Sequence, residues 1–476
     1  MDRAGLTALY LDEVRQQGAS PAELVGDVAE SQQVLLNFFH PGARYLSRPL
    51  FIGRAERDRL LANLETVRGM LVSLPDRLYG GDFAAFAREA GAVDYQIPAI
   101  TASRSSSVSP QTRADLYEDS AGFRLLEFNM GSPLAGMENA DICRTMLKHP
   151  LLADFAAVHR LGYVDTMREQ VANLLADTGF APGSFPVVAV TDWPSSYAGP
   201  LGNYMHRLAV RWRELGLDAH GCHMGELEVR GGRVWLAGRP VDIISRMFLL
   251  DHLLEPGAAE LMDPVLAAAG RGEVAMFTPL DAELFGSKAA LAMLSDQRNR
   301  HLFTAAELAS LDAILPWTRM VRPGPVTLED GGTADLMDYA IGHQDDLVLK
   351  PALRYGGQEV LPGWHPGTSA ELWHDTLSKA LGGSYVIQRR IRPVAELFPG
   401  EDGVPGRWIV LWGLYTGIRG FGGIFARGTP VESGQAVLNL HGGTPIGCGL
   451  TAEPAPAEPT PTEPTPADGA PADGAT

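Results

Sequence analysis

The sequence has few of the features that would place a protein outside an ordinary reducing, aqueous compartment. Its 476 residues include three cysteines, Cys143, Cys222 and Cys448, which are far apart, so no disulfide framework is expected. No uninterrupted apolar run reaches about eighteen residues, so we expect no transmembrane helix. The first residues, MDRAGLTALYLDEVRQQG, contain early acids and no apolar core, so we expect no secretory signal and a cytoplasmic location.

Positive charge is also scarce. The formal net charge is −18, which argues against a nucleic acid or an anionic membrane as a partner because both attract clustered lysine and arginine. Part of this excess lies in the last residues, 451–476, which carry five acids among prolines and alanines and which we expect to be disordered. The oligomeric state cannot be inferred from these features.

The remaining chain is long enough for several domains, and its patterns change along its length. Residues 1–100 show apolar spacing typical of helices, and residues 101–180 start with short strands around the turn EDSAG before helical spacing returns. Strands alternate with helices over 181–275, which predicts a small Rossmann-like α/β unit. Residues 276–450 mix both elements and end in long strands. We therefore predict an α/β fold with α+β lobes.

The stretch RADLYEDSAGFRLLEFN places four polar residues at regular spacing. If its two halves are antiparallel strands, Arg113 and Asp115 share one face of the first strand, and Glu127 and Asn129 share one face of the second. Two carboxylates and an amide would then converge, and such oxygen-only donors suit Mg²⁺ or Mn²⁺. A nearby arginine suits a phosphate. Taken alone, the pattern also fits a hairpin with a solvated outer face.

Three later segments add features that suit a nucleotide. Lys350 ends the apolar strand DLVLKP and precedes the loop glycines Gly356 and Gly357, a combination that can meet phosphate with a point charge and backbone N–H groups. Lys288 begins a helix, where backbone donors also favour anions. Gln388 lies on the apolar strand SYVIQRRI, which could form one wall of an adenine slot. A solvated lysine or an ordinary core strand would explain each segment separately.

Together these segments resemble the ATP-grasp superfamily, and in particular its circularly permuted branch of the glutathionylspermidine synthase type. The carboxylate strands come first and the lysines follow, and R-x-D followed by E-x-N is similar to that family's metal segment. LKPALRYGGQEV and YVIQRRI resemble its lysine, glycine-loop and hinge segments, and GLYTGIRGFGGIFARG resembles its closing strands. The likeness covers about residues 100–450 and leaves the N-terminal helices unexplained. The α/β unit resembles the one that precedes the ATP-grasp lobes in many members.

The resemblance implies an ATP-dependent ligase that joins a carboxylate to an amine through an acyl phosphate. It assigns Mg²⁺ to Asp115, Glu127 and Asn129, and it assigns the transferring phosphoryl group to Arg113 and Arg419. The nucleotide would contact the residues Lys288, Lys350, Gly356, Gly357, Gln388, Arg389 and Ile391. Amino acids, peptides and polyamine-like compounds all qualify as substrates. A small-molecule kinase and a non-catalytic nucleotide-binding protein are the alternatives.

Overall fold

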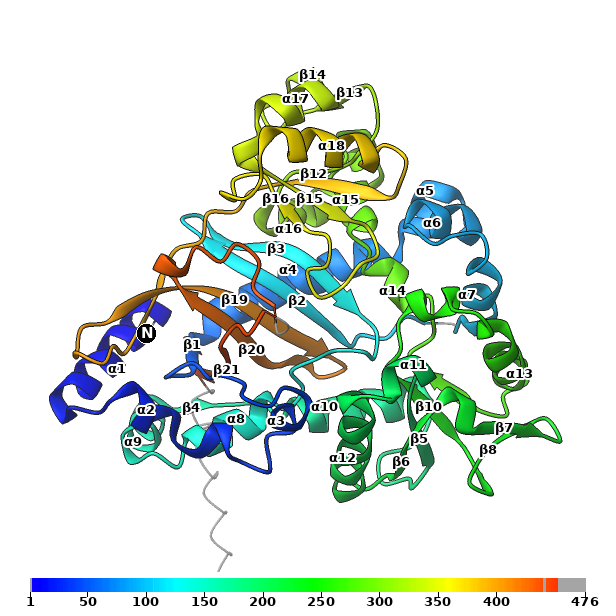
Figure 1. The fold of residues 1–476 in the computed structure, drawn as a ribbon, viewed down its shortest axis with the longest axis horizontal. Helices are drawn as coiled ribbons and strands as arrows, with labels where there is room; N and C mark the ends of the chain where they lie inside the picture. Colours follow the sequence, from blue (N-terminus) through cyan, green and yellow to red (C-terminus); the bar gives the residue numbers. More distant parts are fainter. Residues whose placement is uncertain (1, 106, 440–441, 453–476) are drawn as a thin grey trace, which may run out of the picture.

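A computed structural model of the chain describes residues 2–105, 107–439 and 442–452, and the acidic segment beyond residue 452 lies outside this range. The fold is a mixed α/β arrangement with several sheets. Figure 1 shows a large central sheet, an upper lobe above it, and a small α/β unit at the lower right. Within the described residues, no helix combines the length and the apolar character needed to cross a membrane.

The large sheet joins segments from both ends of the chain. Its main path runs in the order β1 (Leu50–Ile52), β21 (Ile446–Ala452), β20 (Gly420–Pro430), β19 (Gly406–Gly417), β2 (Thr112–Asp119) and β3 (Gly122–Met130), with β18 (Glu396–Phe398) on β19 and β4 (Leu161–Gly162) on β21. Neighbours from β21 to β3 are antiparallel, whereas β1 pairs with β21 in parallel. The N-terminal region is therefore built into this sheet through β1.

The N-terminal region is mostly helical, as its apolar spacing predicts. Leu6, Tyr10 and Val14 lie four residues apart and are buried on one side of the first helix, which Asp2 caps by accepting from the Gly5 amide. The α-helices before β2 are α1 (Arg3–Gln17), α2 (Pro21–Val25), α3 (Leu36–Phe39), α4 (Arg54–Val72), α5 (Leu74–Tyr79), α6 (Phe83–Glu89) and α7 (Ile97–Ser103). Those after β3 are α8 (Asn139–Met146), α9 (Pro150–His159) and α10 (Thr166–Asp177).

The small α/β unit has a four-stranded parallel sheet in the order β11 (Ala275–Phe277), β10 (Ile243–Arg246), β5 (Val187–Asp192) and β6 (Asp218–His223). Helices α11 (Pro194–Tyr197), α12 (Pro200–Glu214) and α13 (Ala258–Gly270) accompany it, together with the short sheet β7 (Leu227–Arg230), β8 (Arg233–Leu236) and β9 (Arg239–Pro240). Trp212 of α12 is fully buried among the apolar residues of β5 and β6. Parallel pairing places the ends of β5 and β10 at the same edge.

The upper lobe contains an antiparallel sheet in the order β12 (Thr318–Met320), β17 (Tyr385–Arg389), β15 (Leu347–Pro351) and β16 (Leu361–Pro362). Around it lie α15 (Lys288–Ser295), α17 (Leu336–Gly342), α18 (Ala370–Ala380) and the hairpin of β13 (Pro325–Thr327) and β14 (Thr333–Asp335). Helices α14 (Ala282–Phe285) and α16 (Ala305–Ile314) contact β3 of the large sheet. Trp317, Trp373, Leu349 and Ile387 form the centre of its core. The expected strand around Lys350 is β15.

A buried ion pair ties the α/β unit to α14. The Arg246 guanidinium, at the end of β10, lies 2.6 Å from a Glu283 carboxylate oxygen and also donates to the carbonyl oxygens of Phe248, Thr278 and Pro279. Both side chains are essentially unexposed. Every strong donor on this arginine therefore has an acceptor, which is the condition under which a buried charge is tolerated.

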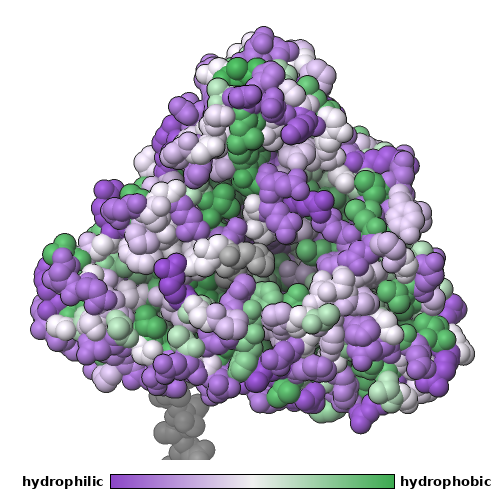
Figure 2. Space-filling model, in the orientation of Figure 1, coloured by the Kyte–Doolittle hydropathy of each residue, from purple (hydrophilic) through white to green (hydrophobic). Residues whose placement is uncertain are grey.

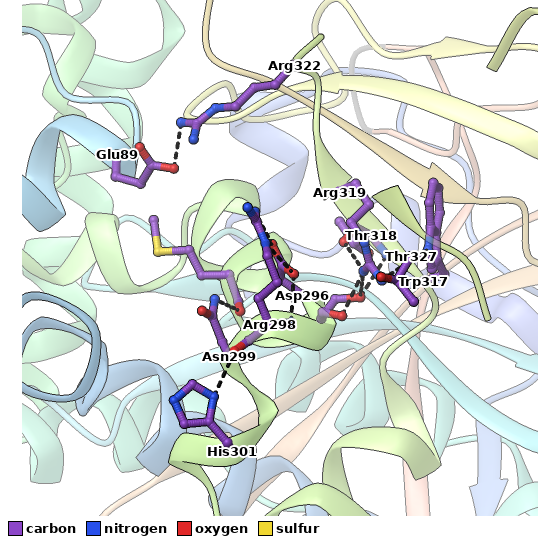
Figure 3. A network of polar contacts seen from close by, with 12 residues as sticks. Glu89, Asp296, Arg298, Asn299, His301, Trp317, Thr318, Arg319, Arg322 and Thr327 are labelled. Atoms are coloured by element: carbon purple, nitrogen blue, oxygen red, sulfur yellow. Dashed lines mark hydrogen bonds and ion pairs between the residues drawn. The ribbon is translucent and has the colours of Figure 1, made fainter. Parts of the chain in front are cut away.

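A second buried arginine supports the base of the upper lobe (Figure 3). Arg319 of β12 donates from Nη1 to the Ser295 carbonyl oxygen at 2.7 Å and from Nη2 to the Thr327 carbonyl oxygen at 2.8 Å. Its guanidinium also lies over the Trp317 ring, 5.0 Å from the centroid. Arg319 thereby links the end of α15, strand β12 and the β13 hairpin, and β12 pairs with the strand that carries Gln388.

Replacing Arg319 should therefore loosen the upper lobe. We expect Arg319→Met to lower the free energy of unfolding by about 1–3 kcal/mol, because the part-buried carbonyl groups of Ser295 and Thr327 each lose a charged donor. Arg298→Met is the matched control, since that side chain is 84% exposed and its ion pair, among the residues that the structure describes, is with Asp296 of its own turn. Urea unfolding followed by tryptophan fluorescence measures both. Equal midpoints for the two variants would contradict the structural role given to Arg319.

Candidate active site

The hairpin of β2 and β3 brings the four polar residues of the RADLYED segment and its partner strand together. Arg113 pairs with Asn129, and Asp115 pairs with Glu127, so all four side chains project from one face. On the opposite face, Ala114 and Phe128 pack into the core that also holds Leu64 of α4. The shared face expected from the alternation is confirmed, and it is buried, not solvated.

Asp115 is the most enclosed member of this group. Arg113 donates to its two carboxylate oxygens at 2.8 and 3.1 Å, and Nη2 of Arg427, from β20, lies 2.7 Å from Oδ2. Burial raises the pKa of Asp115, but the charges and hydrogen bonds of Arg113 and Arg427 outweigh it, so the net pKa lies below its usual range. The carboxylate is therefore ionised, and it holds two guanidinium groups at the site.

Both candidate lysines reach the same face from the upper lobe. The Lys288 ammonium lies 3.0 Å from Oε2 of Glu127 and donates to the Arg354 carbonyl oxygen at 2.8 Å. The Lys350 ammonium donates to Oε1 of Gln388 at 2.6 Å and to the Leu126 carbonyl oxygen at 3.2 Å. Segments more than 150 residues apart in the chain thus converge, as the order of motifs suggests.

Lys350 donates to the backbone of β3 at an irregular point of the β2–β3 hairpin. The pairing shifts between Asp115 and Leu116, where a β-bulge places Leu126 opposite no single partner residue. Burial, aided by the nearby charge of Lys288, lowers the pKa of Lys350 to about 7, while Glu127 and Asp115 oppose this shift. A bound polyanion would favour the protonated lysine, so the charge of this residue is coupled to occupancy of the site.

These residues line one cavity of about 380 Å³. The space-filling view shows the corresponding face hollowed between the upper lobe and the lower body (Figure 2). Arg389, Ile391, Gly356 and Gly357 line the cavity, whereas Gln388 is buried behind it and holds Lys350. Gly357 has φ of 74°, and a Cβ there would lie 2.8 Å from Val437. The glycine loop thus packs closely against the segment 436–439, whose Asn439 also lines the cavity.

Arg419, the second arginine that the resemblance assigns to the phosphoryl group, lies elsewhere. It occupies the two-residue turn between β19 and β20, is 62% exposed, and pairs with Glu169 of α10. It is not among the described residues that line the cavity. Arg427, eight residues further along β20, is buried and lines the cavity beside Asp115. The sequence signal for Arg427 is a single arginine within the otherwise apolar strand GGIFARG.

The oxygen donors on the hairpin are of the kind that binds a divalent cation, although Asp115 now pairs with Arg113 and Arg427 and Glu127 pairs with Lys288. Asp115, Glu127 and Asn129 present two carboxylates and an amide on one face, a donor set that suits Mg²⁺. Among the described residues, no group of three or more His, Cys, Asp or Glu side chains is arranged to hold a metal ion. The fit therefore depends on the amide of Asn129, which now donates to the Arg113 carbonyl oxygen.

The far side of the cavity has a different character. Glu138, just before α8, is 1% exposed, and neither carboxylate oxygen has a hydrogen-bond partner of normal geometry. Tyr204 of α12 and Asp192, the last residue of β5, line the cavity with it. Burial is the main reason that the pKa of Glu138 is raised to about 7, and the charge of Asp141 adds to the shift.

Comparisons with known proteins support the fold. No protein-family model matches the sequence, and no curated protein sequence matches it. The structure is similar to that of a glutathione synthetase-like effector from Globodera pallida in its apo form, with a TM-score of 0.51 and 10% identity over 90% of this chain and 96% of that chain. This likeness shows the overall fold, which is consistent with an ATP-grasp-like architecture.

Two further structures match less well. One is a putative gamma-glutamylcysteine synthetase from Methylobacillus flagellatus, with a TM-score of 0.38 and 12% identity over 81% of this chain and 84% of that chain. The other is a D-cycloserine synthetase, with a TM-score of 0.24 and 17% identity over 56% of this chain and 92% of that chain. Both scores are too low to establish a common fold.

Buried Glu138 should reduce stability as the pH rises. Its folded pKa, about 7, lies above the ordinary glutamate value of 4.5, so the contribution to stability is intact below the lower value and is lost as pH rises through the upper one. Glu138→Gln removes this loss. We expect the stability advantage of the variant to grow by about 1–3 kcal/mol between about pH 5 and pH 8. Urea unfolding of both proteins at each pH tests this, and a constant difference would contradict it.

Proposed function

We propose that this chain is an ATP-dependent ligase that joins a carboxylic acid to an amine, and that it is a circularly permuted member of the ATP-grasp superfamily. The main support is the convergence of the hairpin carboxylates with Lys288, Lys350 and Arg427 around one cavity. Around the hairpin and the two lysines, the cavity lining also holds more cationic than anionic side chains, as a triphosphate requires. The cytoplasmic location remains part of this proposal.

The nucleotide would lie between the upper lobe and the hairpin. Arg389, the last residue of β17, and Ile391, two residues later, would contact the base and sugar, with Gln388 holding Lys350 in place. Lys288 and Lys350 would bind the α- and β-phosphates, and Gly356 and Gly357 would cover them with backbone N–H groups. The glycine loop would exclude water from the bound nucleotide.

The transferring group would lie between Arg113 and Arg427, because both guanidinium groups face the cavity beside Asp115. The two arginines would hold the substrate carboxylate against the γ-phosphoryl group, and their positive charges would compensate the repulsion between these two anions. A Mg²⁺ ion held by Asp115, Glu127 and Asn129 would supply further neutralisation of phosphate oxygens. A carboxylate oxygen takes the phosphoryl group and ADP leaves. The amine then attacks the carbonyl carbon, loses a proton and displaces phosphate.

A product screen tests the reaction class. The purified chain is incubated with ATP, Mg²⁺, and pools of acids and amines, and phosphate release is followed by mass analysis. We expect release only with both an acid and an amine, together with a condensed product. We also expect Asp115→Asn and Lys350→Met to reduce the rate about 100-fold or more, the scale for removing a charge stabiliser. A phosphorylated product formed without amine would indicate a kinase, and nucleotide binding without any turnover would indicate a non-catalytic protein.

The two arginines of the β19–β20 hairpin provide a matched pair. We propose that Arg427, and not Arg419, contacts the transferring group, because only Arg427 lines the cavity. Arg427→Met should lower kcat by about 100-fold, whereas Arg419→Met should leave it unchanged. Steady-state ADP formation with the acid and amine found in the screen measures both. Loss of activity in Arg419→Met with Arg427→Met still active would favour the assignment that the resemblance implies.

A further inference from the structure

The cavity has two ends of unlike charge. The lysines and arginines among its described lining residues come from the large sheet, α15 and the upper lobe: Arg113, Arg427, Lys288, Lys350 and Arg389. The other side of the lining is formed by α3, residues 133–138 and the α/β unit, and it adjoins the first where the Ala135 carbonyl oxygen accepts from Nη1 of Arg113 at 2.8 Å. There the described lining residues include the carboxyl groups of Glu138 and Asp192 and no lysine or arginine. A triphosphate suits the first end, and a cation suits the second.

Asp192 occupies the position in the α/β unit where a ligand is expected. It is the last residue of β5, at the carboxyl edge of a parallel sheet, and the segment after β10 meets it there. Ligands of open parallel sheets bind outside this edge. The Asp192 side chain is 3% exposed and accepts from the Trp193 amide at 2.6 Å, and the described structure shows no arginine or lysine paired with it.

Two other lining side chains, His252 and Tyr204, add polar groups to this side of the cavity. The charge of His252 acts on Asp192, and the His252 ring also shares a hydrogen bond of 2.8 Å with the Ser196 hydroxyl. Tyr204, from α12, interacts with Glu138. An ammonium group needs up to three acceptors, and carboxylate and hydroxyl oxygens can provide them. This side of the cavity therefore offers the acceptors for one compact cation.

The walls between these carboxyl groups are apolar. They consist of Leu36 and Phe39 of α3, Leu201 and Met205 of α12, and Met247 and Leu249 after β10. An apolar wall weakens hydration, so a carboxylate beside it is costly unless a cation pairs with it. Burial accordingly raises the pKa of Asp192 and of Glu138. A ligand with one positive charge and an apolar body would satisfy both the charge and the walls.

We infer that this end of the cavity binds the amine substrate as an ammonium ion that carries a compact apolar group, with Asp192 and Glu138 as its counter-ions. The assignment to the amine substrate rests on the proposed ligase function. A long polyamine is not the ligand that fits, because a second ammonium group would meet either apolar walls or the cationic end. The substrate carboxylate then belongs at Arg113 and Arg427, and the two reactants approach from opposite ends.

A ligand series tests the inference on the full chain without nucleotide. Isobutylamine, isobutanol and isobutyrate have similar apolar groups and differ in charge, and each is titrated by calorimetry and by its effect on Tm. We expect saturable binding of the amine, with the alcohol and the acid weaker by about tenfold or more. Equal affinity for all three, or preference for the acid, would overturn the inference.

Substitutions locate the binding site. Asp192→Asn and Glu138→Gln should each weaken isobutylamine binding by about tenfold. Asp218→Asn is the matched control, because Asp218 begins β6 at the opposite edge of the same sheet, where it pairs with His220 and Arg239. Unchanged amine affinity in both test variants would overturn the inference. If a variant does not fold, the charge series on the unaltered protein still decides.

The same measurements separate the inference from the proposed function. Amine binding that depends on Asp192 with no ATP-dependent condensation in any acid–amine pool would reject the ligase proposal and leave the ammonium subsite standing. Condensation that proceeds with an unaltered KM for the amine in Asp192→Asn and Glu138→Gln would support the ligase and reject the subsite. A change in these variants that affects only the kinetic constants for the acid, and not those for the amine, would also reject the subsite.

Discussion

The ionised carboxylate of Asp115 holds two arginines in a nearly dry site, and the rest of the cavity depends on this contact. Arg113 and Arg427 come from different strands, and their mutual repulsion would force them apart without the acid between them. Together with Lys288, which pairs with Glu127, they leave a local excess of positive charge. A buried excess of this kind is stable only when an anion occupies the site or when the surrounding groups rearrange.

The two-residue period of the hairpin was enough to predict which side chains share a face, because alternation is a property of any strand. It could not predict that this face is buried, since burial depends on β19, β20 and the upper lobe, which come some 200 residues or more later. The bulge at Leu126 was also beyond sequence patterns. Its apolar side chain gives no sign that its carbonyl oxygen accepts from Lys350.

The two arginines of the β19–β20 hairpin show how a resemblance and a pattern can disagree. Arg419 lies in GIRG, two residues enclosed by glycines, which is itself a signal for a tight hairpin turn. Arg427 lies in an apolar strand, where a lone charge usually has a buried partner. A stricter use of these two local rules would have selected Arg427. By contrast, Glu138 follows a loop with no regular period, and its burial against α12 depends on packing that the sequence does not reveal.

The parallel pairing of β1 with β21 has a consequence for biosynthesis. On the ribosome, β2 and β3 emerge about 300 residues before β20. Asp115 and Arg113 therefore lack Arg427 while most of the chain is made. The pairing of β1 with β21 cannot form until residues 446–452 have left the exit tunnel. Such long-range closure is slow, because the entropy of a large loop is lost before the contact forms. Late truncations should thus leave an open sheet with a charged, unoccupied edge, a natural substrate for chaperones and proteases.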